Sequence, residues 1–301
     1  MKGDVLVLGA GASTPYGFPT GNELRNKILE DFSYETKVNG AIFPKILTVV
    51  QDPLNLPFSP EQCARFRDEF RLAQTYSIDA FIERRAEEFQ EIGKFAISHC
   101  LRRCESEAAL FDTGDWYQAF WNRVLPNGYP FLREFTVITF NYDRSLQHYL
   151  MTAAKAALGP AYRDDMYDRV RILPMHGSFS KVSANAPFGS DEERHTPEFA
   201  RSIYLPHEFS GKNLQFSPFD NARDALSDAK RIFILGFGFD DTNTERLFND
   251  LDLSKAEIHA TGVGLGDGVK RRACDALKRP RQDLFYKGGN ATMVELISDL
   301  V

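Results

Sequence analysis

The stretch Val5–Ser13, which reads VLVLGAGAS, decides the fold that the sequence predicts. Val5–Leu8 is a short apolar run without alternation, which is typical of a strand covered on both faces in a parallel sheet. Two glycines follow, and then Thr20 and Glu23 have the spacing of a capping box that begins a helix. The chain therefore opens with a strand, a glycine-rich turn and a helix, which is the repeating unit of an α/β fold.

Further short apolar runs continue this pattern later in the chain. The predicted strands are Phe135–Phe140, Val170–Met175, Arg231–Leu235, Glu257–Thr261 and a short one near Phe285. Helical patterns follow most of them, and Thr242 with Glu245 has the spacing of a second capping box. Strands that alternate with helices indicate an α/β fold with a Rossmann-like, doubly wound and mostly parallel sheet.

Between the first two strands lies a long stretch with helical patterns and little sign of a strand. Helices are expected at Glu61–Gln74, over one long segment that begins at Ser77, and at Asp115–Leu125. After the strand at Val170–Met175, the polar segment Phe179–His195 is expected to be a loop.

These patterns predict a single domain over residues 1–301. Residues 1–39 and 131–301 would form the Rossmann-like core, and residues 40–130 an inserted all-helical subdomain. The insertion is the candidate surface for assembly with other chains.

The composition excludes several classes of protein. Lys and Arg number 36 against 42 for Asp and Glu, a net charge of −6, which argues against direct binding to nucleic acid. No apolar run approaches the roughly 20 residues that cross a bilayer. Val5–Leu8 is too short for the apolar core of a signal peptide. We therefore expect a cytoplasmic protein without a membrane partner.

The four cysteines stand at irregular spacing, which does not predict a disulfide framework in a chain of this length. His99, Cys100 and Cys104 lie on one predicted helix, but a structural zinc site needs a second pair of ligands. These three residues are expected to be buried helix residues. His207 and Glu208 lack the second histidine of a zinc hydrolase motif, so no metal is expected.

Glycine or polar residues stand at five predicted strand ends: Gly9–Ser13, Asn141–Asp143, His176–Ser178, Gly236–Gly238 and Thr261–Gly266. In an open parallel sheet, ligands bind at the carboxyl ends of the strands. Glycines there would let backbone N–H groups approach a pyrophosphate. The dinucleotide motif G-x-G-x-x-G fails at Thr14, and no second strand ends in an acid about 20 residues later, which argues against a conventional dehydrogenase.

Each strand end also has a purely structural interpretation. Gly9–Ser13 could be only a tight turn between strand and helix. Asp143 could cap the following helix while Asn141 fills a turn. His176 has a side chain that titrates near neutrality and can act as a general base, but it could equally be a turn residue.

Taken in chain order, four of these segments resemble the sirtuin family. Gly9–Ser13, with Gly17–Pro19 after it, resembles the family's GAG-x-S…G-I-P loop. Thr139–Asp143 resembles its T-Q-N-I-D motif, and Met175–Gly177 resembles its catalytic L-H-G. Leu235–Gly238 stands where the family has its L-G-T-S turn.

The departures from the family's pattern are informative. Deacylating sirtuins carry a zinc ribbon of two cysteine pairs after L-H-G, and Phe179–Tyr204 contains no cysteine. Phe140 replaces the Gln of the family's motif, and Thr20–Asn22 replaces the D-F-R that follows G-I-P. Together with Thr75–Ile82 and Asp241-x-Asn243, these features are similar to the divergent sirtuin-like proteins of bacterial antiphage defence.

This resemblance implies an NAD⁺ hydrolase that cleaves the nicotinamide–ribose bond to give nicotinamide and ADP-ribose, and so depletes NAD⁺ on infection. It implies that Asn141, Asp143 and His176 carry the catalysis. The residues that it implies for NAD⁺ binding are Gly9, Ala10, Gly11, Ser13, Pro19, Gly177, Gly236, Gly238, Thr261 and Gly262. Relatives of this kind work as homo-oligomers or with a partner such as a HerA-type ATPase, so both are expected here.

Other functions remain open at this stage. One is a non-catalytic regulatory or scaffolding subunit that binds NAD or ADP-ribose, although such a subunit would need the glycines but not the base. Another is an NAD-dependent protein deacylase or ADP-ribosyltransferase, against which the missing zinc ribbon argues.

Overall fold

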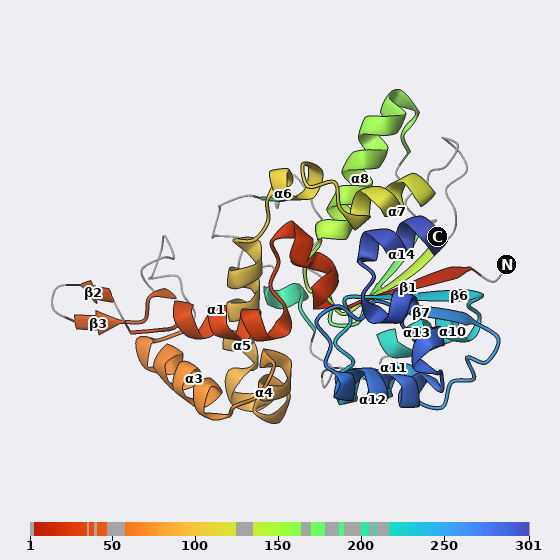
Figure 1. Ribbon diagram of the computed structural model, residues 1–301. Coiled ribbons are helices and arrows are strands. Elements are labelled where there is room, and N and C mark those ends of the chain that lie inside the picture. The colour runs from red at the N-terminus through yellow and green to blue at the C-terminus, as the bar shows by residue number, and fades with distance from the viewer. Residues whose placement is uncertain are drawn as a thin grey trace. The chain divides into compact units, whose positions relative to one another are not determined.

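The computed structural model describes residues 3–34, 36–38, 41–46, 58–124, 135–163, 170–177, 187–189, 200–204, 208 and 217–300. The chain divides into two compact units (Figure 1). The first contains Met1–Gly17, Glu107–His176 and Lys212–Val301, and the second contains Phe18–Ser106 and Gly177–Gly211. The loop expected at Phe179–His195 lies mostly outside the described residues.

A five-stranded parallel sheet is the centre of the first unit. Its strands are β1 (Asp4–Leu8), β4 (Phe135–Thr139), β5 (Val170–Pro174), β6 (Arg231–Leu235) and β7 (Glu257–Ala260). Their order is β5-β4-β1-β6-β7, and every neighbouring pair is parallel. The predicted α/β fold with a Rossmann-like sheet is therefore confirmed. Because the order reverses at β1, the ligand-binding crevice of such a sheet is expected at the carboxyl ends of β1 and β6.

Helices cover both faces of this sheet, which explains why β1 and β6 are apolar after their first residues. Figure 1 shows α7, α8 and α14 on one side and α10, α11 and α12 on the other. These helices are α7 (Trp116–Val124), α8 (Ser145–Leu158), α10 (Pro218–Ser227), α11 (Asp241–Phe248), α12 (Asp267–Leu277) and α14 (Met293–Leu300). The shorter elements are the 3-10 helices η1 (Ala10–Tyr16), η3 (Gly159–Ala161) and η7 (Tyr286–Gly289), with α6 (Glu107–Phe111) and α13 (Arg281–Leu284).

The second unit is mainly helical. Its elements are α1 (Gly21–Asp31), α3 (Pro60–Leu72), α4 (Ile78–Arg84), α5 (Ala86–Arg102) and a small antiparallel pair, β2 (Thr36–Val38) and β3 (Ala41–Phe43). Five phenylalanines form its core, with neighbouring ring centroids 5.0 to 6.1 Å apart. They are Phe32, Phe66, Phe70, Phe81 and Phe89. Rings of this size bury large apolar areas and stabilise a unit that has little sheet.

Two details of the helices differ from the sequence prediction. The long helix expected from Ser77 is wrong: Ser77 caps the short α4, and the chain breaks at Arg85 before α5. The break lets the two helices lie side by side, where a Cβ on Gly93 would come within 2.2 Å of Ile82 Cδ1. The capping box at Thr242 is also wrong, because Asp240 caps α11 by accepting the Asn243 N–H over 2.9 Å.

Two further sequence predictions concern the start of α1 and a strand near Phe285. The capping box of Thr20 and Glu23 is confirmed at the start of α1. A strand near Phe285 is not formed; this residue makes a single bridge to Ala260 between α13 and η7. Of the helices outside the sheet segments, α1 belongs to the second unit, whereas α6 and α7 belong to the first.

Candidate functional site

The loop after β1 contacts the loop after β6, backbone against backbone. Gly9 donates its N–H to Leu235 O and Gly11 donates to Gly236 O, each over 3.0 Å. A Cβ on Gly236 would lie 2.1 Å from the Ala12 nitrogen, and its φ of +57° is one that glycine adopts readily. Both amides are thus engaged within the protein. These glycines let the two loops touch at the switch point.

Asn141, at the end of β4, contacts the glycine-rich loop. Its Nδ2 donates to Ser13 Oγ over 2.9 Å, and both side chains are buried. Its Oδ1 is buried and has no hydrogen-bond partner among the described residues. A buried acceptor without a donor is costly, so this oxygen is suited to accept a hydrogen bond from a ligand. Ser13 is 2% exposed, and it acts by holding Asn141.

Asp143 is tied to the start of α8. Its Oδ1 accepts hydrogen bonds from the backbone N–H of Ser145, over 3.0 Å, and from the Ser145 hydroxyl. The Ser145 hydroxyl in turn lies 2.7 Å from the Tyr117 hydroxyl. Asp143 therefore forms a local turn at the start of α8, and this turn fixes the position of its carboxylate.

Tyr117 is a member of this network that the sequence did not reveal. Its ring stacks on Tyr16 with centroids 3.8 Å apart, and its N–H donates to the Tyr16 hydroxyl over 2.7 Å. Burial, with the nearby charge of Asp143, raises the pKa of the Tyr117 hydroxyl well above its ordinary value, so it stays protonated. Tyr117 lies on α7, far along the chain from the motifs, and no spacing rule connects it to them. Ser145, two residues after Asp143, does fit an Asx-turn pattern.

His176 follows β5 and is 3% exposed. Its ring lies 5.5 Å from the Phe140 ring and 5.4 Å from the Tyr142 ring, centroid to centroid. These two aromatic residues flank Asn141 in the sequence. A backbone hydrogen bond also joins the two strand ends, because the Met175 N–H donates to Thr139 O over 2.8 Å. The ends of β4 and β5 therefore bring His176 to the segment that carries Asn141.

The remaining predicted residues of the first unit have distinct surroundings. Thr261 accepts the Gly236 N–H on its hydroxyl over 3.0 Å, which links the ends of β6 and β7. Gly262 packs closely against Gly289, whereas no atom lies within 4 Å of where a Cβ on Gly238 would stand. Gly238 thus leaves open space beside the loop after β6. Ala10 is the first residue of η1.

Two predicted residues, Pro19 and Gly177, belong to the second unit. The φ of Gly177 is +68°, and a Cβ there would lie 2.5 Å from Ser202 O. Gly177 pairs with Ile203 in a single antiparallel bridge. Ser178 and His207 lie outside the described residues.

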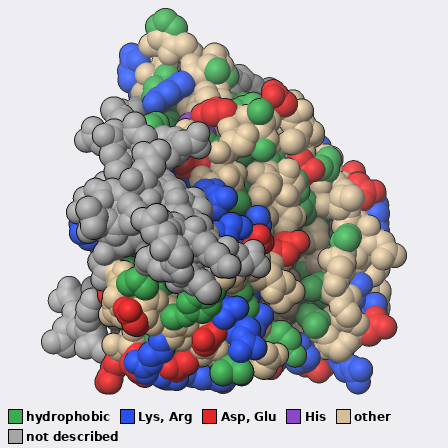
Figure 2. Space-filling view, turned by 90° about the vertical axis from the view of Figure 1, so that its left-hand side faces the viewer, with side chains coloured by type: hydrophobic (Ala, Val, Ile, Leu, Met, Phe, Trp, Pro, Cys, Tyr) green, Lys and Arg blue, Asp and Glu red, His purple; other side chains and the backbone are tan. Residues whose placement is uncertain are grey.

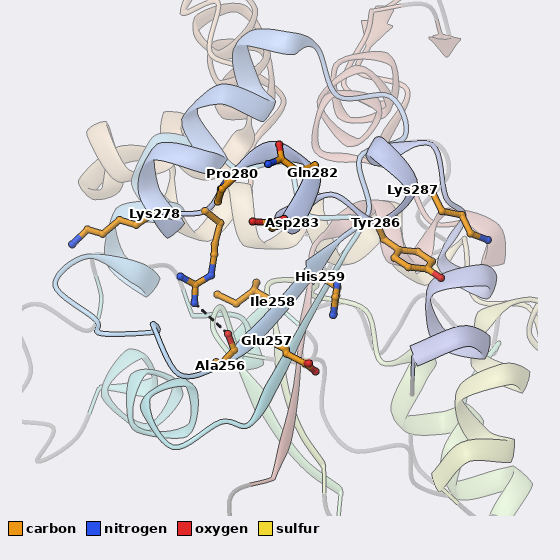
Figure 3. A pocket seen from close by; sticks show the side chains of 11 residues that line it. Ala256, Glu257, Ile258, His259, Lys278, Pro280, Gln282, Asp283, Tyr286 and Lys287 are labelled. Atoms are coloured by element: carbon orange, nitrogen blue, oxygen red, sulfur yellow. Dashed lines mark hydrogen bonds between the residues drawn. The ribbon is translucent and has the colours of Figure 1, made fainter.

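A pocket of about 670 Å³ lies at the edge of β7, beside α13 and η7 (Figure 3). None of the predicted site residues lines it. Several of its polar groups are already paired: Arg279 donates to Leu253 O and Ala256 O, and the Tyr286 hydroxyl donates to Asp299. Because polar groups that already have partners are poor ligand contacts, this pocket is not the candidate site.

His99 and Cys100 are buried on α5, as predicted, beside Asp31. Cys100 Sγ lies 3.3 Å from Asp31 Oδ2, and His99 Nε2 lies 3.8 Å from it. Burial lowers the pKa of His99 to about 4. Cys104 lies just after this helix. In the described ranges, no group of three or more His, Cys, Asp or Glu side chains is arranged to hold a metal ion.

Acidic and basic side chains are intermixed on the face that Figure 2 shows. Among the described residues, Arg85 and Glu69 form an ion pair over 2.6 Å. Of the helices in the described part of the chain, none combines the length and the apolar character that a membrane span requires.

A Rossmann-like sheet whose glycine loops meet at the switch point is an arrangement typical of α/β proteins that bind nucleotides. In a comparison with known families, residues 136–278 match the family model described as a SIR2-like domain. The match covers just under half of the chain and includes Asn141, Asp143, His176 and the loop after β6. The sirtuin-like resemblance is therefore confirmed, and a SIR2-like domain points to an NAD-utilising enzyme. No curated protein matches the chain.

Proposed function

We propose that the chain is an NAD⁺ hydrolase that cleaves the bond between nicotinamide and ribose, with nicotinamide and ADP-ribose as products. The observation that carries the proposal is the buried, unpaired Oδ1 of Asn141. This amide is held by Ser13 and lies between the two residues whose rings contact His176. The SIR2-like match over the same segment supports NAD⁺ as the substrate.

The reaction needs few groups. Water adds to the ribose carbon as the bond to the pyridinium nitrogen breaks, and that bonding pair leaves with nicotinamide, which becomes neutral. No general acid is required. The water proton is accepted by a base, and the transition state has oxocarbenium character that nearby dipoles and charges must stabilise.

Three side chains have roles in this proposal. His176 accepts the proton of the attacking water or of a ribose hydroxyl, a role that contributes typically about 10²- to 10⁴-fold. Asn141 Oδ1 orders the ribose hydroxyls or the water. Asp143 holds the nicotinamide carboxamide, and the turn at Ser145 with Tyr117 behind it keeps this carboxylate in place.

The glycines would hold the rest of the substrate. The pyrophosphate would lie over the joined loops after β1 and β6, where Gly238 leaves open space. The ends of β6 and β7 are linked through Thr261, so the adenosine would extend toward Thr261 and Gly262. Ala10 stays in this proposal as a neighbour of the substrate.

The proposed biological role is NAD⁺ depletion in antiphage defence. The motifs shared with divergent sirtuin-like proteins support it, as does the absence of cysteine from Phe179–Tyr204. Unrestrained NAD⁺ cleavage would be toxic, so we propose control through a homo-oligomer or a partner such as a HerA-type ATPase. Full activity of an isolated monomer would contradict this control.

The test of the reaction is product analysis. The purified chain is incubated with NAD⁺, with and without an acetyl-lysine peptide, and the products are separated by chromatography. We expect equal amounts of nicotinamide and ADP-ribose, whether or not peptide is present. Nicotinamide release that requires the peptide would identify a deacylase instead. Binding of NAD⁺ without any release, at every protein concentration, would identify a regulatory subunit.

A further inference from the structure

Lys270 is a buried cation at the carboxyl end of β7. It lies in the first part of α12 and is 7% exposed. Its Cε stands 3.0 Å from where a Cβ on Gly262 would be, and its Nζ stands 3.0 Å from where a Cβ on Gly289 would be. The ammonium is therefore directed between two glycines, toward the start of the loop that precedes α12.

The ammonium of Lys270 makes no hydrogen bond or ion pair with any described residue. Among the described residues, the ammonium has one cation–π contact: its Nζ lies 5.9 Å from the centroid of the Phe285 ring. Lysine side chains are seldom buried to this extent unless the ammonium is paired. The Lys270 Nζ is not one of the fully enclosed side-chain atoms that lack a partner, so an anion can reach it from the solvent.

The loop that joins β7 to α12 begins at Gly262, beside Lys270 Cε, and carries further backbone donors. It reads GVGLGDG over residues 262–268. No atom lies within 4 Å of where a Cβ would stand on Gly264, Gly266 or Gly268, so a ligand has room to approach the backbone. Gly266 is the N-cap of α12 and supplies no side-chain cap, and the Lys270 N–H begins the helical hydrogen bonds by donating to Gly266 O. The amides before it, at the positive end of an 11-residue helix, are then available to an anion.

We propose that the loop Gly262–Lys270 binds a phosphate group of a nucleotide. Lys270 would supply the charge, and the amides at the start of α12 would supply directed hydrogen bonds, which together are the usual phosphate-binding set. The glycines keep the approach free of side chains. This inference rests on the proposed function only for the identity of the nucleotide. This phosphate has two possible sources. It is the 2′-phosphate of NADP⁺, bound as a phosphorylated form of the substrate, or it is a phosphate group of a separate nucleotide that acts as an effector.

The proposed phosphate site is tested by measuring ligand binding, without any measurement of turnover. Thermal unfolding and calorimetric titration are followed with inorganic phosphate, with NAD⁺ and with NADP⁺, against chloride at equal ionic strength. The variant is Lys270→Met, and the control is Arg271→Met, which removes the same charge from an exposed neighbour on the same helix. We expect wild type and Arg271→Met to bind inorganic phosphate, and Lys270→Met to bind it about tenfold or more weakly.

The unliganded variant provides a second readout. Lys270→Met should unfold at about the same temperature as wild type, because the ammonium has no hydrogen bond or ion pair with a described residue to lose. A preference of wild type for NADP⁺ over NAD⁺ that is lost in Lys270→Met identifies the 2′-phosphate. Equal affinities for the two dinucleotides, with phosphate binding still dependent on Lys270, identify a separate effector. Wild type that does not bind phosphate, or Lys270→Met that binds it as wild type does, overturns the inference. No outcome depends on nicotinamide release, so the proposed hydrolase can fail while this site stands.

Discussion

The backbone N–H of Gly11 donates to the carbonyl oxygen of Gly236 over 3.0 Å, and this hydrogen bond joins the loop after β1 to the loop after β6. The two strands are neighbours, and Leu8 is paired with Leu235 at their last residues. The joined loops therefore form at the point where the strand order reverses, which is where open α/β sheets bind ligands. The SIR2-like match begins after β1, so this contact connects the matched segment to the glycine-rich loop that precedes it.

Gly236→Ala should destabilise the protein by about 2 kcal/mol or more. The new Cβ would stand 2.1 Å from the Ala12 nitrogen, at a φ of +57°. Urea unfolding measures the loss. Gly238→Ala is the matched control, because its Cβ would meet nothing within 4 Å, and its free energy of unfolding should stay close to that of wild type. Equal stability of the two variants would show that the close loop contact is not formed.

Ser13→Ala should slow nicotinamide release through Asn141. The substitution removes the acceptor that the Asn141 Nδ2 uses, so the amide loses its fixed orientation. A fall of about tenfold in kcat is expected, with a larger fall for Asn141→Ala. Because both act through one amide, the double variant should be no slower than Asn141→Ala alone. Independent, multiplying effects in the double variant would contradict this coupling.

Tyr117→Phe should cost about 1 kcal/mol of stability, because it removes the hydrogen bond to the Ser145 hydroxyl within a buried network. The same change should lower the rate of nicotinamide release, since Ser145 holds Asp143. Tyr149→Phe, on α8, is the control. The Tyr149 ring stacks on Phe111, but its hydroxyl makes no hydrogen bond with a described residue. Chemical denaturation and initial rates are measured for both. The account of this network fails if the two variants behave alike.

Acid should destabilise the second unit through His99. Burial lowers its pKa to about 4, below the roughly 6.5 of the unfolded chain. Between these values the unfolded state binds a proton that the folded state does not, so this contribution to stability is complete above about pH 6.5 and is lost as the pH falls toward 4. The loss is about 3 kcal/mol at most.

His99→Gln should reduce this dependence on pH, because the amide does not titrate. Urea unfolding at several pH values between 4 and 7 gives the comparison. The prediction is contradicted if the free energy of unfolding of His99→Gln falls with pH as steeply as that of wild type.

The sheet could be predicted from sequence because its signals are local. Val5–Leu8, Phe135–Thr139 and Arg231–Leu235 are short apolar runs, each followed by glycine or polar residues, and each forms a parallel strand where it was expected. Because Ser13 and Asn141 both follow predicted strands, the sequence places them at the same edge of the sheet, and the structure joins them by a hydrogen bond. That inference required only that parallel strands end at the same edge.

The missed features depend on contacts between distant segments. The sequence has the same apolar spacing through α4 and α5, and the break at Arg85 follows from packing of Gly93 against Ile82. Tyr117 joins the site from α7 through a hydroxyl contact that no local pattern encodes. The hydrogen bonds of the Gly9 and Gly11 amides to the loop after β6 are likewise contacts between distant segments, which no local pattern predicts.

The most direct test of the hydrolase compares wild type with His176→Ala. Nicotinamide release from NAD⁺ is followed over a range of protein concentrations, and NAD⁺ binding is measured by calorimetry on the same samples. We predict release by wild type, release slower by about a hundredfold or more in His176→Ala, and NAD⁺ affinity that is unchanged between them. Release by His176→Ala at the wild-type rate would contradict the central claim that this imidazole is the catalytic base.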